Sequence, residues 1–223
     1  MMPAEQSFQF AHMGLRLATP SDIPALADIH VHAMPGDYLP RLGCNFLESM
    51  LYSTALATPG VTVIVGPDHG SIQGFVLLAG DGQALTDRLK SFRMGIVKAL
   101  LCHMWHDPLL LMETVSLATG LCASSVPLPQ EYEHLPEIYA IATREGHRDK
   151  GLGSQLVTAA LDVLRRISDD KVRCLVKTPS ERARRFYEKN GFKVIGRTRR
   201  VGRTFSILLF DGQDTGLPDD LEN

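Results

Sequence analysis

Residues 138–154 read IYAIATREGHRDKGLGS and contain the most informative pattern in this chain of 223 residues. The apolar run Ile138–Thr143 has the composition of a buried β-strand. The later part of the stretch, residues 148–154, carries two glycines immediately before apolar positions that recur with helical spacing. The stretch therefore predicts a strand, a short glycine-containing loop and a helix, in that order.

A loop of this kind suits an anion, in particular a diphosphate. The first backbone N–H groups of a helix have no partner within the helix, and the helix dipole is positive there. Gly151 and Gly153 remove Cβ atoms where a ligand must approach the backbone, while Arg148 and Lys150 add positive charge at the rim. A second reading, in which the glycines only make a tight turn, stays open.

Two better-known phosphate loops do not fit this stretch. The Walker A pattern fails because the chain contains no Gly-Lys-Ser or Gly-Lys-Thr sequence. The dinucleotide-binding pattern fails because Leu156 stands where a third glycine is needed. The loop is therefore expected to bind a diphosphate in a way that differs from both the Walker A loop and the dinucleotide-binding loop.

Outward from this stretch, the spacing of apolar residues alternates between that of strands and that of helices. Predicted helices cover about residues 20–33, 46–56, 152–167 and 179–190, and predicted strands cover about residues 15–17, 61–65, 72–78, 138–143, 172–176, 192–195 and 205–210. This order predicts an α/β fold, in which a mixed sheet is flanked by helices on both faces.

The chain divides into an N-terminal extension, residues 1–14, one domain, residues 15–210, and a flexible tail, residues 211–223. Residues 82–136 are an insertion between the third and fourth strands that is too long for a hairpin loop. The helical spacing of apolar residues in its first half predicts a helical insertion.

Two helix starts share one capping pattern. In the segment 19–22, Thr19 is placed to cap the helix and Pro20 to occupy its first position. The segment 178–181 repeats this pattern, so that Thr178 is expected to cap and Glu181 to complete a capping box.

Composition narrows the class of protein. Charged residues make up 22% of the chain and the formal net charge is -2, which gives no basic face for nucleic acid. The four cysteines are widely spaced, residues 1–14 have no secretory pattern, and no apolar run is long enough to span a membrane. We therefore expect a cytoplasmic protein with reduced thiols. His103 and His106 lack a third ligand at matching spacing, so no metal is expected.

Two motifs in this order resemble those of a known family. Arg148-x-x-Gly151-x-Gly153 after a strand resembles motif A of the GNAT N-acetyltransferase superfamily, and the segment 183–192, ARRFYEKNGF, resembles the later helix and strand of that family. The resemblance covers about residues 15–81 and 137–210. It implies a GNAT-like acyl-CoA N-acyltransferase fold with a largely antiparallel sheet. It also implies an enzyme that transfers an acetyl group from acetyl-CoA to a primary amine by direct attack on the thioester.

The resemblance further implies which residues hold acetyl-CoA. The backbone of Ile141 and Thr143 would pair with the pantetheine arm, and an N–H at Ala142 or Thr143 would stabilise the oxyanion. The remaining contacts implied for acetyl-CoA are Arg148, Asp149, Lys150, Gly151, Leu152, Gly153, Ser154, Ser180, Ala183, Phe186 and Tyr187.

Three of these implied roles have alternatives. Tyr187 matches the acid that protonates the leaving thiolate, with Phe186 filling the core beside it; otherwise Tyr187 is itself a core residue. Glu137 matches the general base of the branch that includes histone acetyltransferases; otherwise it is an exposed residue at a strand end. Ser180 stands where the family usually has Asn, and either contacts the pantetheine arm or only caps a helix.

The acceptor is the least defined partner. A small-molecule amine is favoured. Residues 34–45 correspond to the region that lines the acceptor pocket in this family, where Asp37, Tyr38, Arg41 and Asn45 either contact the acceptor or are only surface loop residues. The insertion is expected either to roof that pocket or to form a homodimer surface. Neither nucleic acid nor a membrane is expected as a partner. The alternatives are a protein lysine or N-terminal acetyltransferase and a catalytically silent CoA-binding sensor or interaction module.

Overall fold

The computed structural model describes residues 14–66, 70–81, 85, 88, 110, 132, 134–167, 173–200 and 203–212. Most of the predicted insertion and most of the predicted tail lie outside these residues, so the helical insertion stays a prediction. Within the described part, seven strands form one sheet in the order β1-β2-β3-β4-β5-β7-β6. The strands are β1 (Arg16–Leu17), β2 (Val61–Gly66), β3 (Gly74–Ala79), β4 (Glu137–Thr143), β5 (Arg173–Thr178), β6 (Lys193–Arg200) and β7 (Arg203–Asp211).

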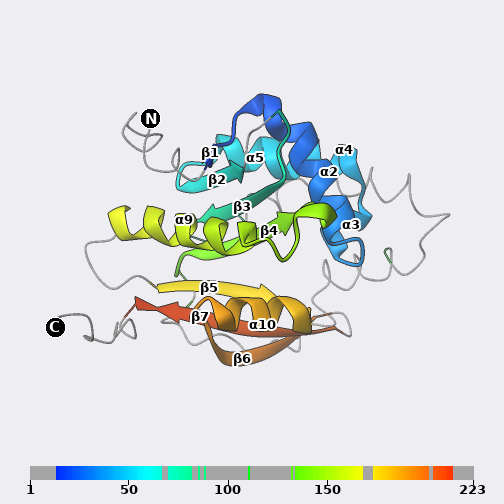
Figure 1. The fold of residues 1–223 in the computed structure, drawn as a ribbon. Coiled ribbons are helices and arrows are strands. Elements are labelled where there is room, and N and C mark those ends of the chain that lie inside the picture. Colours follow the sequence, from blue (N-terminus) through cyan, green and yellow to red (C-terminus); the bar gives the residue numbers. More distant parts are fainter. Residues whose placement is uncertain are drawn as a thin grey trace.

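The sheet is mixed and largely antiparallel, as expected. Strands β4 and β5 are its one parallel pair among the described strands, and the other neighbouring pairs are antiparallel. A parallel pair needs a crossover, and helix α9 (Leu152–Ile167) supplies it. This helix begins at the glycine loop, so the crossover places that loop at one end of the sheet (Figure 1).

Helices cover both faces of the sheet, as predicted. Helix α9 packs on β2, β3 and β4, and its buried apolar stripe shares one core cluster with helix α10 (Glu181–Lys189). The opposite face is covered by α2 (Ile23–Ala33) and the helical segment that follows it, in a second core cluster. Figure 1 shows α9 and α10 on the same side of the sheet, with α2 at the end where the loop lies.

The second predicted helix forms, but its interior departs from regular α-helical geometry. The 44–57 segment runs through α4 (Cys44–Phe46), the π-helical turn η3 (Leu47–Tyr52) and α5 (Ser53–Ala57). A short helix, α3 (Tyr38–Arg41), also lies in the region predicted to be an acceptor loop. Because a π-turn inserts an extra residue, it turns Leu47, Leu51 and Tyr52 into the core.

The two capping predictions have different outcomes. At the first site Thr19 N–H donates to the Asp22 carboxylate at 2.7 Å, ahead of the 3-10 turn η2 (Pro20–Asp22). Arg16 of β1 adds a bidentate pair to the same carboxylate, and its guanidinium lowers the pKa of Asp22 to about 2. Asp22 therefore ties the first strand to the first helix.

At the second site the predicted cap is wrong by two residues. Helix α10 begins at Glu181, and Ser180 is its N-cap, accepting from the Ala183 N–H at 3.3 Å. Thr178 is the last residue of β5, and its hydroxyl accepts from the Ser180 N–H. β5 continues through Thr178, which pairs with Ser206 of β7, so the helix starts only after Ser180, and Glu181 pairs with Arg184 instead of completing a capping box.

One buried pair in the second core cluster gives a testable pH dependence. His30 of α2 and the Tyr52 hydroxyl are 2.8 Å apart, and burial lowers the pKa of His30 to about 4. Between the ordinary value of about 6.5 and pH 4, the unfolded chain therefore binds a proton that the folded chain does not. We expect acidification over this range to cost about 3 kcal/mol of the free energy of unfolding through His30 alone.

Urea unfolding at pH 7, 5.5 and 4 measures this loss. The His30→Gln variant keeps a polar group but has no titration in this range, so its stability should fall less steeply. Equal slopes for the parent and the variant would show that His30 accepts its proton in the folded state.

Candidate active site

The candidate site lies where β4 and β5 separate. These strands pair only through Glu137 with Leu175 and Ile138 with Val176, although β4 continues to Thr143. On the other edge of β4 the register with β3 shifts, so that Leu77 pairs with Ala140 and Leu78 with Ile138. Tyr139 is thus an extra residue in β4, and such a bulge bends a strand away from its partner. The result is a wedge whose one side is the unpaired edge of β4.

The glycine loop continues directly from the open end of this wedge. Two of its residues have positive φ, Asp149 at 60° and Gly151 at 85°, and α9 then begins at Leu152. The Gln155 N–H is bonded to the Gly151 carbonyl at 3.1 Å, so the N–H groups before Gln155 lie in the first turn of α9. This is the helix N-terminus that the sequence predicted, directly after the loop that follows β4.

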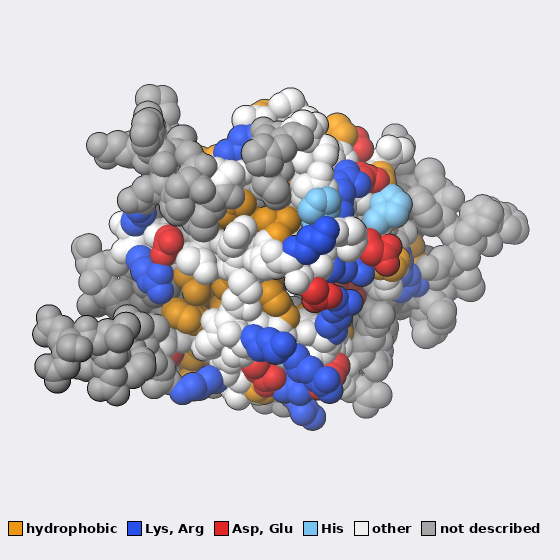
Figure 2. Space-filling view, in the orientation of Figure 1, with side chains coloured by type: hydrophobic (Ala, Val, Ile, Leu, Met, Phe, Trp, Pro, Cys, Tyr) orange, Lys and Arg blue, Asp and Glu red, His pale blue; other side chains and the backbone are white. Residues whose placement is uncertain are grey.

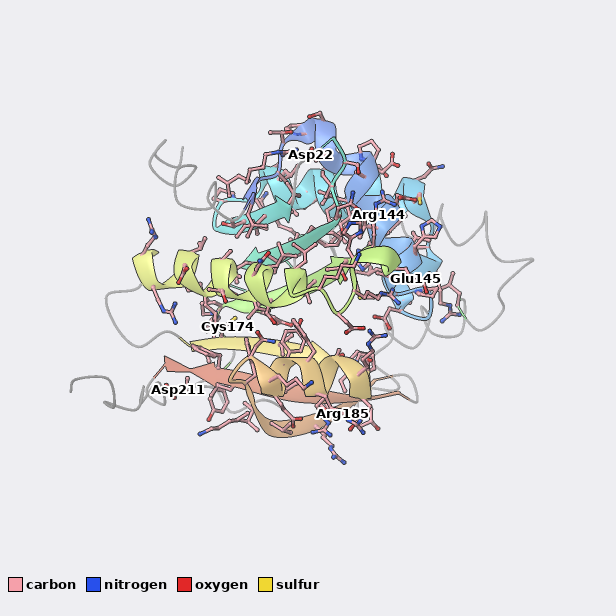
Figure 3. All side chains as sticks on the ribbon, viewed as in Figure 1. Asp22, Arg144, Glu145, Cys174, Arg185 and Asp211 are labelled. Carbon is pink, nitrogen blue, oxygen red and sulfur yellow. The ribbon has the colours of Figure 1, made fainter. Side chains whose placement is uncertain are left out.

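Two arginines fix the loop to the rest of the fold. The Arg144 N–H and side chain donate to the carbonyls of Gln73 and Ile72, and its guanidinium lies 2.8 Å from Asp28 of α2. Figure 3 shows Arg144 lying against α2. Arg148, which was expected to face an anion at the rim, also donates to the Ala33 carbonyl at 3.4 Å. The loop is therefore held in place by contacts of its own.

The two glycines of the loop have different roles, and the expectation for Gly153 is corrected. A Cβ at Gly151 would meet nothing within 4 Å, so that position is open as well as left-handed. A Cβ at Gly153 would lie 3.1 Å from the ring of Phe186, so its missing side chain accommodates α10 rather than leaving space for a ligand. Leu152 is likewise buried in the core and offers only its backbone N–H to the site.

Helix α10 forms the far wall of the site. Its Arg182 reaches across to Asp149 of the loop at 3.0 Å, an exposed pair. Figure 2 shows Lys and Arg side chains gathered over α10 and near the loop, on the face in view. Ser180 is the N-cap of this helix, and its hydroxyl accepts a hydrogen bond from the Ala183 N–H. This capping bond gives the Ser180 side chain a structural role that needs no ligand.

Tyr187, rather than Phe186, is the more deeply buried of the two aromatic residues. Tyr187 is 3% exposed and belongs to the core cluster, whereas Phe186 only packs against the edge of that cluster. Burial, with smaller contributions from Cys174 and Glu137, raises the pKa of Tyr187 well above its usual range. The phenol therefore stays protonated over the usual range of pH.

Glu137 is not the exposed strand-end residue of the alternative reading. Its carboxylate is bonded at 2.7 Å to Nζ of Lys177 on β5, and both side chains are mostly buried. Lys177 was not among the predicted functional residues. The local sequence shows a lysine directly after an apolar strand, but not that this strand lies beside the one beginning at Glu137.

Several predicted site residues lie on β4 or follow it directly. Ile141, Ala142 and Thr143 lie in its part that does not pair with β5, the loop residues follow Thr143, and Glu137 lies where the two strands pair. Tyr187 belongs to the core cluster that also contains Ile138 and Val176. Within the described residues no group of three His, Cys, Asp or Glu side chains is close enough to hold a metal ion. No helix of the described part is long and apolar enough to cross a bilayer. His103 and His106 lie outside the described residues.

Two mycothiol acetyltransferases match part of this chain in sequence. A mycothiol acetyltransferase of Acidimicrobium ferrooxidans is 38% identical over 92 residues, and one of Beutenbergia cavernae is 36% identical over 88 residues. Each match covers 40% of this chain and 30% of the relative. The chain therefore matches less than a third of the length of these relatives.

Solved structures match most of the chain. The acetyltransferase yncA of Salmonella typhimurium, solved with acetyl-CoA, has a TM-score of 0.53 at 15% identity, covering 92% of this chain and 97% of that one. The enzyme AAC(6')-Ib, solved with paromomycin and acetyl-CoA, has a TM-score of 0.55 at 19% identity, covering 89% and 93%. At these identities the likeness concerns the fold.

The model of the Acetyltransferase (GNAT) family matches residues 118–192, which contain the wedge strand, the glycine loop, both helices of the site and Tyr187. Over this segment, about a third of the chain, the sequence resembles the GNAT acetyltransferases, and the described residues have the same fold as the solved acetyltransferase structures.

Proposed function

We propose that this chain transfers an acetyl group from acetyl-CoA to the primary amine of a small molecule, by direct attack of the amine on the thioester. The observation that carries the proposal is the wedge between β4 and β5, which opens onto an anchored helix N-terminus. A ligand that carries a diphosphate at one end and a long amide-containing arm at the other fits both features.

The chain's own groups would hold such a donor in two places. The first-turn N–H groups of α9, Leu152 to Ser154, would bind the diphosphate, with Gly151 leaving open space beside them. The edge of β4 from Ile141 to Thr143, which pairs with no strand on the β5 side in the described part, would hydrogen-bond the amides of the arm. Arg148, Asp149 and Lys150 would line the rim of the loop, and Ser180, Ala183 and Phe186 would form the α10 wall.

The chemistry needs three groups, and the wedge supplies a candidate for each. A backbone N–H at Ala142 or Thr143 would stabilise the oxyanion, because a splayed strand leaves such donors unpaired. Glu137 would accept the proton of the acceptor amine. Tyr187 would donate a hydrogen bond to the leaving sulfur, whose reference pKa near 8.5 lets it leave without a strong acid.

A small-molecule acceptor is favoured over a protein by the names of the related proteins. Two partial relatives are mycothiol acetyltransferases, and one protein of similar fold was solved with paromomycin and acetyl-CoA. The compound itself is left open, since the chain matches only 30% of those relatives.

An assay of thiol release with the full chain tests the proposal. Acetyl-CoA is combined with a panel of amino sugars, polyamines and amino acids, and in parallel with lysine-containing and free N-terminal peptides, and products are identified by mass spectrometry. We expect release of CoA with at least one small amine, with the acetyl group on its nitrogen.

Two results would replace the proposal by one of its alternatives. Turnover on peptides alone would make the chain a protein acetyltransferase. Tight binding of acetyl-CoA by calorimetry, with no turnover on either panel, would make it a CoA-binding sensor.

A further inference from the structure

One ion pair stands at the closed end of the wedge. The first two residues of β4, Glu137 and Ile138, pair with Leu175 and Val176 of β5, and the rest of β4 does not pair with β5. Lys177 follows directly after Val176. The Glu137–Lys177 contact therefore joins the two strands beside their paired residues, at the point where the strands separate.

The pair lies on the opposite face of the sheet from Tyr187. Lys177 pairs with Ile207 on β7, and Ile207 belongs to a small apolar cluster that is separate from the α9 and α10 core. Successive side chains of a strand point to opposite faces, so Cys174 and Val176 lie on the face opposite to Lys177. Both belong to the core cluster that contains Tyr187. A thioester in the wedge would thus meet the phenol from one face and the carboxylate from the other.

Within the part of the chain that the structure describes, one oxygen of the Glu137 carboxylate has a partner. Lys177 Nζ donates to Oε2 at 2.7 Å, with 22% of the lysine side chain and 12% of the glutamate side chain exposed. Among the described residues, Oε1 takes part in no hydrogen bond or ion pair. One oxygen is thus fixed, and the other keeps its lone pairs for a proton donor.

We infer that Lys177 is a positioning residue for the reaction: its ammonium fixes Glu137 through Oε2 so that Oε1 faces the acceptor amine. The inference rests on the proposed function, because it gives Glu137 the part of the base. Without the ammonium, a mostly buried carboxylate loses its counter-charge and the bond that sets its rotamer. A base displaced in this way loses rate although its own chemistry is unchanged.

A double-mutant cycle separates this role from a purely structural one. The variants are Lys177→Met, Lys177→Arg, Glu137→Gln and the Glu137→Gln/Lys177→Met pair, with Lys189→Met, at an exposed position in the last turn of α10, as the matched control. The measurements are kcat, KM for the amine, acetyl-CoA affinity and melting temperature. If Lys177→Met does not fold, Lys177→Gln takes its place in both backgrounds.

We expect Glu137→Gln to lower kcat by about 10²-fold and Lys177→Met by about tenfold, with acetyl-CoA affinity unchanged. Lys177→Arg should restore most of the rate, and Lys189→Met should behave as the parent. In the Glu137→Gln background, Lys177→Met should change kcat by less than about twofold, because the residue it positions is already gone.

The outcomes distinguish failure of this inference from failure of the proposed function. Equal losses from Lys177→Met in both backgrounds, or an unaltered kcat in Lys177→Met beside a slow Glu137→Gln, would overturn the positioning role alone. An unaltered kcat in Glu137→Gln would remove the base assignment, and the positioning role with it. A parent chain that turns over no amine would refute the proposed function and this inference together.

Discussion

Replacing Gly151 by Asp is expected to lower the affinity for acetyl-CoA by at least about 10²-fold, which corresponds to roughly 2.7 kcal/mol of binding free energy. Gly151 precedes the first turn of α9, where the helix dipole and unpaired N–H groups attract an anion. A carboxylate placed there would occupy the open space beside these groups and repel a diphosphate. Titration calorimetry with acetyl-CoA measures the loss directly.

Backbone strain needs its own control, because Gly151 has φ +85° and any side chain there is strained. Gly60 provides the match: its φ is +78°, and a Cβ on it would also meet nothing within 4 Å. It lies at the other end of the sheet, where its carbonyl accepts from Gly80 N–H. Gly60→Asp should therefore share the small loss of stability and keep the affinity. Unchanged affinity in Gly151→Asp would refute the diphosphate assignment of the loop.

The second large effect is expected from Tyr187→Phe, which should lower kcat by about 10²-fold and leave acetyl-CoA affinity within about twofold. The Tyr187 ring packs edge-on against Phe186 and Phe192, and a phenylalanine ring keeps those contacts. Only the hydroxyl is lost, and with it the proposed donor to the leaving sulfur. Steady-state kinetics with saturating acetyl-CoA gives kcat, and calorimetry gives the affinity.

The pH profile gives this prediction a second test. Because burial raises the pKa of Tyr187, its hydroxyl should remain protonated to beyond pH 10, and kcat should show no alkaline decline caused by this residue. A decline near pH 9 that disappears in Tyr187→Phe would contradict that account. Tyr52→Phe, which removes another buried hydroxyl and its bond to His30, should lower stability and leave kcat unchanged.

The sequence predicted those features of the structure that depend on residues close together in the chain. The glycine loop and the start of α9 follow from a few adjacent residues, and the structure confirms the helix boundary at Leu152. The strand and helix order also follows from periodicity, which reports the face that each segment buries. Even the mixed sheet with helices on both faces was predicted, because this order of elements has few ways to pack.

Errors arose where two segments compete for the same residue. Thr178 is a residue type that commonly caps helices, but it pairs with Ser206 as part of β5. Ser180 is the N-cap of α10 instead. Gly153 was predicted to leave space for a ligand. In the folded chain the ring of Phe186 from α10 occupies the space beside it. In both cases a partner distant in the sequence decided between two locally acceptable structures.

By itself, then, the sequence determined the order of the elements, the fold class and the loop suited to an anion, since each depends on neighbouring residues or on a repeating pattern. Only the tertiary structure decided the wedge, the burial of Tyr187 and the pairing of Glu137 with Lys177, which are 40 residues apart. The physical reason is the parallel crossover through α9, which sets β5 beside β4 at a register that no local pattern specifies.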